Sequence, residues 1–144
     1  MRDVRKMADI WPIAAQVLSA GGCFRLWPSG RSMLPLLREG RDSVLLAPPK
    51  DIRPLDILLV RAADSSFVLH RAIRVDEGGI TLCGDARTAC EGPFPREAVL
   101  AVVTTIYRDE EALDPRSTRA IAAARRRVRW NALRRAAKRM LKKK

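Results

Sequence analysis

Short apolar runs broken by polar turn segments dominate the chain and predict a mainly β protein. The runs are rich in Val, Ile, Leu and Phe, and Gly, Pro, Asp and Ser separate them. They read "CFRLW", "SVLLA", "DILLVRA", "SFVLHRAIRV", "GITLC" and "AVLAVVTTIY". The fourth and fifth runs flank Asp76 to Gly79 and predict a β-hairpin. We therefore expect a small β domain of about six strands.

Two segments near the ends have helical spacing instead. The first runs from Pro12 to Ala20 and stops at a Gly-Gly pair. The second covers residues 117–142, and its apolar residues change sides along the helix. Ile121, Ala124, Val128 and Ala132 share one face, whereas Trp130, Leu133, Ala137 and Leu141 fall on nearly the opposite one. A single clean apolar face is therefore not expected in this segment.

Charge divides the chain unevenly and suggests its organisation. Residues 1–114 hold all 16 acidic and 15 of the 28 basic residues, a net charge of 15 − 16 = −1. Residues 115–144 hold the other 13 basic residues and no acidic ones. We predict an N-terminal helical segment at 1–21, a β domain at 22–114 and a basic helical tail at 115–144.

Composition excludes several classes of protein. An apolar content of 47% over 144 residues is enough for one domain with its own core. The three cysteines form no CxxC pair, so neither a disulfide framework nor a zinc site is indicated, and no metal or cofactor is expected. No apolar run reaches the roughly 18 residues that a membrane span needs. These features favour a protein of the cytoplasm.

Few residues offer hydrolytic chemistry, which needs a nucleophile, a base beside it, a group that orients the base, and donors for the oxyanion. Ser32 lies between Gly30 and Pro35, where the irregular backbone of a turn is favoured. His70 is the only histidine and stands in the middle of a predicted strand. Asp85 follows the hairpin and can reach back toward that histidine. Each residue alone is more often structural than catalytic.

Four segments in order resemble the signal peptidase I and LexA-like serine peptidases. They are "GRSMLPLLREGRDSVLL", "RPLDILLV", "VLHRAI" and "CGDA", within roughly residues 22 to 107. The resemblance implies a small LexA-like or signal-peptidase-like β fold with Ser32 as the nucleophile. It is closest to the endoplasmic-reticulum, archaeal and SipW-like branch, where a histidine followed by arginine is the base, as in His70-Arg71. Lys50 is the only lysine between residues 7 and 137, so a Ser-Lys dyad has no candidate.

The same resemblance suggests roles for further residues. Asp85 matches the Gly-Asp box and is our preferred orienter of His70, with Glu91 as the alternative. The backbone N–H of Ser32 is the expected oxyanion donor, and Gly30 or Ser29 supplies any second one. The candidates for substrate binding, both from the nucleophile box, are Met33 and Pro35.

The chain also departs from the family pattern. Gly40-Arg41-Asp42 replaces the usual Gly-Asp, and Leu55 stands where a glycine normally precedes Asp56. No apolar span precedes Ser32, so a general secretory signal peptidase is not expected. The favoured function is a serine endopeptidase that cleaves a peptide or protein precursor, with leader removal as one option. The alternative is a non-catalytic binding module with the peptidase fold.

The basic tail raises a separate question about partners. Thirteen positive charges attract acidic lipid headgroups and the phosphates of nucleic acid. We weigh membrane-surface docking equally with a tail that is simply solvated. Specific nucleic-acid recognition is not expected, since no helix-turn-helix or aromatic stacking platform is visible. Docking would place the protein peripherally at the inner face of the membrane.

Overall fold

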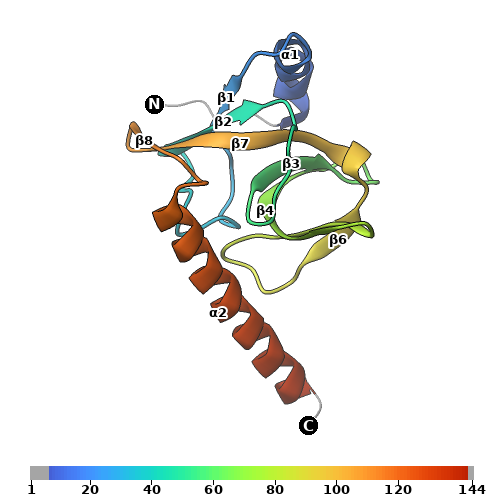
Figure 1. The fold of residues 1–144 in the computed structure, drawn as a ribbon, viewed down its shortest axis with the longest axis vertical. Helices are drawn as coiled ribbons and strands as arrows, with labels where there is room; N and C mark the ends of the chain where they lie inside the picture. Colours follow the sequence, from blue (N-terminus) through green and yellow to red (C-terminus); the bar gives the residue numbers. More distant parts are fainter. Residues whose placement is uncertain (1–6, 143–144) are drawn as a thin grey trace.

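The computed structural model describes residues 7–142 and contains one antiparallel sheet with a helix at either end (Figure 1). The fold class predicted from the sequence, mainly β with an N-terminal and a C-terminal helix, is confirmed. In chain order the elements are α1 (Met7–Ser19), β1 (Phe24–Leu26), β2 (Asp42–Ala47), β3 (Ile57–Arg61), β4 (Phe67–Asp76), β5 (Gly79–Cys83), β6 (Glu91–Phe94), a 3-10 turn η1 (Arg96–Ala98), β7 (Val99–Arg108), β8 (Glu111–Leu113) and α2 (Thr118–Lys142).

The sheet has the strand order β1-β2-β7-β3-β4-β5-β6, with β8 paired to β7, and all pairs are antiparallel. The long strand β7 joins the N-terminal strands to the hairpin strands (Figure 1). The predicted hairpin is present, because β4 pairs with β5 across the turn that follows Asp76. Six of the eight strands coincide with the six predicted runs.

Alternation along β3 explains how the sheet builds two apolar cores. Ile57 and Leu59 face one cluster, while Leu58 and Val60 face the other, and all four are almost fully buried. The first cluster also receives Met33 and Leu37 from the turn after β1, together with residues of α1. The turn that carries Ser32 is therefore anchored in the larger core.

The structure extends α1 beyond its predicted start. The helix begins at Met7, and Pro12 lies inside it rather than at its first position. Met7, Ile10 and Trp11 are half-buried against the first core cluster. This packing stabilises the extra turn, although proline removes one backbone donor there.

Two strands escaped prediction because their sequences look like loops. β6 contains Gly92 and Pro93, and β8 is a three-residue strand with no buried side chain. Pairing with β5 and β7, respectively, makes them strands despite this composition.

The basic segment forms one continuous helix, α2, that contacts the β domain through a few residues on one side. Ala124 and Asn131 of α2 are buried, and Asn131 donates a hydrogen bond from Nδ2 to the Asp85 carbonyl oxygen at 2.9 Å. Just before α2, Arg116 binds both carboxylate oxygens of the buried Asp56 at 2.9 and 2.8 Å. Helix α2 is therefore fastened to the domain. Over residues 7–142, no helix is long and apolar enough to cross a membrane.

The departure at Leu55 has a visible backbone consequence. Leu55 adopts a φ of 76°, in the left-handed region that glycine enters without strain. Its N–H still donates to the Ala72 carbonyl oxygen at 2.6 Å, and its own carbonyl oxygen accepts a bond from Arg71 at 2.9 Å. Strand β3 starts two residues later in full register with β4, so the substitution leaves the sheet intact.

Candidate functional site

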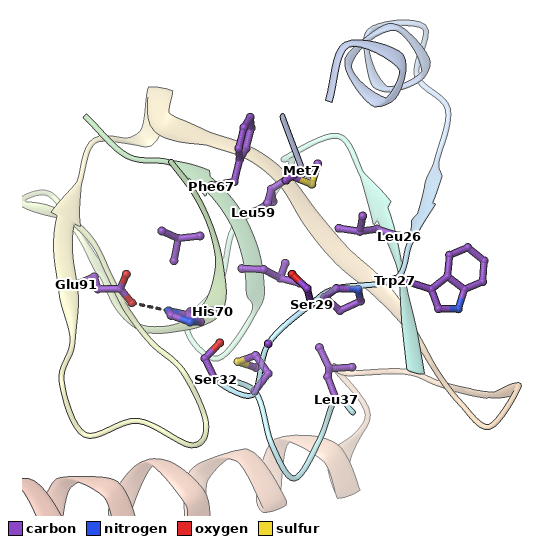
Figure 2. Close-up of a pocket in the computed structure, with 15 residues that line it drawn as sticks. Met7, Leu26, Trp27, Ser29, Ser32, Leu37, Leu59, Phe67, His70 and Glu91 are labelled. Atoms are coloured by element: carbon purple, nitrogen blue, oxygen red, sulfur yellow. Dashed lines mark hydrogen bonds and ion pairs between the residues drawn. The ribbon is translucent and has the colours of Figure 1, made fainter. Parts of the chain in front are cut away.

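One cleft of about 290 Å³ brings Ser32, His70 and Glu91 together (Figure 2). Its walls come from α1, from the segment after β1, and from β3, β4 and β6. Apolar side chains line most of it: Met7, Leu26, Trp27, Met33, Leu37, Leu59, Phe67, Val68 and Leu69. The polar groups gather at one end, where Figure 2 shows the Ser32 hydroxyl pointing toward the imidazole of His70.

The backbone around Ser32 is held by the loop that follows β5. Ala86 donates its N–H to the Ser32 carbonyl oxygen at 2.9 Å. A Cβ on Gly84 would lie 2.5 Å from that same oxygen and 3.2 Å from Cδ2 of His70. Only glycine permits this close approach, so Gly84 sets the spacing between the serine turn and the histidine strand.

His70 is oriented by Glu91. Nδ1 of His70 lies 2.5 Å from Oε1 of Glu91, which is the first residue of β6. A carboxylate only accepts hydrogen bonds, so we assign the proton to Nδ1 and leave Nε2 as the acceptor nitrogen. In the part of the chain that the structure describes, neither Nε2 of His70 nor the Ser32 hydroxyl has a hydrogen-bond partner. Both are available to a substrate.

Asp85, the preferred orienter in the sequence analysis, makes a different interaction. Its two carboxylate oxygens accept bonds from Nε and NH2 of Arg71, each at 2.8 Å. Both side chains are about 95% buried. Strand alternation explains this pairing. Arg71 points to the opposite side of β4 from His70, and Asp85 lies on the Arg71 side. The prediction that Asp85 contacts His70 is therefore wrong, and the alternative Glu91 makes that contact.

The expected oxyanion donors lie in the same cleft. Ser32 sits outside any helix or strand, and its N–H donates to no backbone acceptor among residues 7–142. Ser29 and Gly30 also line the cleft and are exposed to solvent. Ser29 and Gly30 are thus placed near the serine, while their role as a second donor stays a prediction.

The two substrate-binding candidates separate. Met33 is 5% exposed and forms part of the cleft wall, where its sulfur also accepts the Asp85 N–H at 3.5 Å. Pro35 lines a second cavity of about 290 Å³, which it shares with Arg71 and residues of α2. The prediction for Pro35 does not fit this geometry, because the turn carries its ring to the far side.

An ion pair between Arg38 and Asp42 holds the end of the segment that runs from Ser32 to β2. Asp42 is fully buried; burial raises its pKa, but bonds from the Arg38 side chain and from backbone N–H groups outweigh burial and lower the pKa overall. Arg38 contacts Asp42 at 2.8 Å and also reaches Asp109. The chain between Ser32 and β2 is thus tied to the end of β7.

The three cysteines lie outside the cleft that contains Ser32. Cys23, Cys83 and Cys90 are free thiols outside the cleft lining. Burial, together with a bond to Cys90, raises the pKa of Cys83 to about 11, so this thiol stays protonated at neutral pH. In the described residues, no three His, Cys, Asp or Glu side chains gather as a metal site.

Two contributors to the site were missed in the sequence. In the sequence analysis Gly84 entered only as part of the Gly-Asp box, and Asn131 received no role in the basic segment. Asn131 is a polar residue amid arginines and alanines on a helix face, which is the one signal that it is buried and hydrogen-bonded.

Comparison of the chain with models of known protein families, with curated proteins and with solved structures gave no match.

Proposed function

We propose that this protein is a serine endopeptidase that cleaves a peptide or protein precursor, with Ser32 as nucleophile and His70 as base. The observation that carries the proposal is the shared cleft, in which the Ser32 hydroxyl faces an imidazole already held by Glu91. The resemblance of the serine and histidine segments to the signal peptidase and LexA-like peptidases supports it independently. Removal of a leader from a precursor is one form of this reaction.

The proposed chemistry follows the logic of a serine, histidine and acid triad. Nε2 of His70 accepts the Ser32 proton while Oγ attacks the peptide carbonyl carbon. The Ser32 N–H stabilises the oxyanion, with Ser29 or Gly30 as second donor. The imidazolium then protonates the leaving amine, and water, deprotonated by His70, hydrolyses the acyl-enzyme. Glu91 keeps Nδ1 protonated and stabilises the transient positive charge.

The cleft favours an apolar segment of substrate beside the cleaved bond. Leu59, Phe67 and Met33 form an apolar wall that leads away from Ser32. An extended peptide can lay alternate apolar side chains against such a wall while its backbone passes the serine. The family's preference for small residues next to the bond is part of the proposal.

The test is N-terminal proteomics on cells that contain the wild-type protein or Ser32→Ala. We expect chain ends that depend on Ser32 and that follow small residues. Ser19→Ala is the matched control, because this serine is exposed on α1 outside the cleft and binds only the Ala15 carbonyl oxygen. Ends that persist in Ser32→Ala at equal protein abundance would contradict the proposal.

The alternative function, a non-catalytic binding module, is favoured by the basic surface of α2. It predicts no Ser32-dependent chain ends in any condition where the folded protein is abundant. It also predicts that a bound peptide, lipid or nucleic acid is retained equally by wild type and Ser32→Ala.

A further inference from the structure

Most of the exposed large apolar side chains lie on the C-terminal half of α2. Among the described residues, six large hydrophobic side chains are exposed, and four of them lie between positions 130 and 141. Their exposed fractions are 57% for Trp130, 65% for Leu133, 72% for Met140 and 71% for Leu141. At 3.6 residues per turn, these positions share one side of the helix.

The contacts of α2 explain why its apolar residues change sides along the sequence. The inner side faces the domain, where Ala124 and Asn131 are buried and Arg135 donates to the Thr88 carbonyl oxygen at 2.6 Å. Lys138 binds the Thr88 hydroxyl at 3.0 Å one turn later. Because these contacts hold the helix in one rotation, Trp130, Leu133, Met140 and Leu141 must point outward. We call these four residues the outer stripe.

Uncompensated positive charge accompanies the outer stripe. Helix α2 contains ten basic residues and no acidic residue: Arg119, Arg125, Arg126, Arg127, Arg129, Arg134, Arg135, Lys138, Arg139 and Lys142. Within residues 7–142, none of these ten forms an ion pair with a carboxylate. Arg129 and Arg134 lie on either side of the stripe in the helical projection.

Apolar side chains bordered by unpaired arginines match one surface better than others. Pairing with a second copy of α2 would bring two positively charged helices together at a repulsive cost. Nucleic acid would neutralise the charge but leave Leu133, Met140 and Leu141 in water. An anionic bilayer surface accepts both, because the stripe enters the acyl boundary and the arginines meet the headgroups.

We propose that the outer stripe of α2 docks the protein on an anionic lipid surface. The helix lies flat in the interface with Trp130 at headgroup level, while its inner side keeps its contacts with the 84–89 loop. Docking therefore leaves the domain folded as it is. The proposal does not depend on the peptidase activity.

The test measures co-sedimentation of the full chain with vesicles. Vesicles of phosphatidylcholine mixed with phosphatidylglycerol should bind the protein, and vesicles of phosphatidylcholine alone should not. The double variant Leu133→Ser/Met140→Ser should weaken binding to the mixed vesicles about tenfold or more, since two apolar side chains no longer enter the bilayer. Ala132→Ser/Ala136→Ser is the control, because it introduces the same two serines off the stripe, and it should bind as wild type.

Two further measurements separate lipid from the other occupants. Binding to a double-stranded DNA oligonucleotide should be equal in wild type and Leu133→Ser/Met140→Ser, because only charge contributes there. Vesicle binding that is likewise unchanged in this variant would overturn the proposal in favour of charge alone. So would sedimentation velocity that shows a dimer of the wild type without lipid and a monomer of the variant. Circular dichroism confirms that the variants fold.

Discussion

Asp85 and Glu91 carry the same charge and lie six positions apart, yet the structure separates their tasks. Asp85 is buried with Arg71 in a two-bond ion pair, while Glu91 is 37% exposed and contacts His70 at the cleft. A buried pair belongs to the stability of the domain. An acid on Nδ1 of a cleft histidine serves the chemistry that we propose. Substitution of each carboxylate should therefore affect different properties.

We expect Glu91→Gln to lower kcat on the order of 10⁴-fold while the free energy of unfolding stays nearly unchanged, since glutamine does not stabilise an imidazolium. Asp85→Asn should instead lower the free energy of unfolding and leave kcat of the folded protein nearly unchanged. It leaves the buried Arg71 charge without a counter-charge, which costs about 3 to 5 kcal/mol of stability. Urea denaturation and steady-state kinetics on both variants check the contrast. Equal loss of stability in both would show that Glu91 is also structural.

At the scale of elements, the irregular segment between β1 and β2 presents Ser32 and needs support at both ends. Gly84 and Ala86 hold the backbone of Ser32, and the Arg38–Asp42 pair holds the return into β2. Met33 and Leu37 bury their side chains between these two points. A segment without regular hydrogen bonding thus becomes rigid enough to hold Ser32 in one position.

The Arg38–Asp42 pair predicts how stability changes in acid. The pKa of Asp42 is lowered in the folded protein, so the ionised carboxylate stabilises the fold above its unfolded pKa, which is about 4. That contribution is lost as pH falls through the lower, folded pKa. We expect Asp42→Asn to be less stable than wild type near pH 7, and the difference to narrow steadily below about pH 4. Urea unfolding across this range tests the sign, and a constant difference would contradict it.

The whole molecule behaves as one folded unit rather than a domain with a free arm. Arg116 compensates Asp56, which is 4% exposed, and Asn131 binds the loop beside the cleft. In Figure 1 the loop before β6 lies beside the middle of α2, and the C-terminal end of the helix extends beyond the rest of the molecule. The charge boundary near residue 114 therefore does not mark the limit of the fold.

Shortening the chain from its C-terminal end tests whether α2 and the β domain form one folding unit. A chain that ends at residue 114 should lose at least about 3 kcal/mol of unfolding free energy, because Asp56 is left buried without its partner. A chain that ends at residue 139 removes only exposed side chains from α2 and should unfold like the full chain. Thermal unfolding of both compares them directly, and an unchanged midpoint for the shorter chain would refute the single-unit description.

The sequence by itself determined the features that depend on neighbours along the chain. Alternating apolar residues specified six strands, turn residues specified the hairpin, and helical spacing specified both terminal helices. The same local patterns singled out Ser32 and His70, which the cleft brings together. These signals survive because each element satisfies its backbone and buries one face by rules that act over a few residues.

Only the tertiary structure decided which groups meet across the chain. In the tertiary structure Asp85 pairs with Arg71 and Glu91 contacts His70. The proline-containing β6 forms a strand, and one side of α2 faces the domain. The physical reason is that a carboxylate, an edge strand or a two-sided helix has several acceptable partners. The choice among them is made by burial and by long-range pairing, which no local pattern encodes.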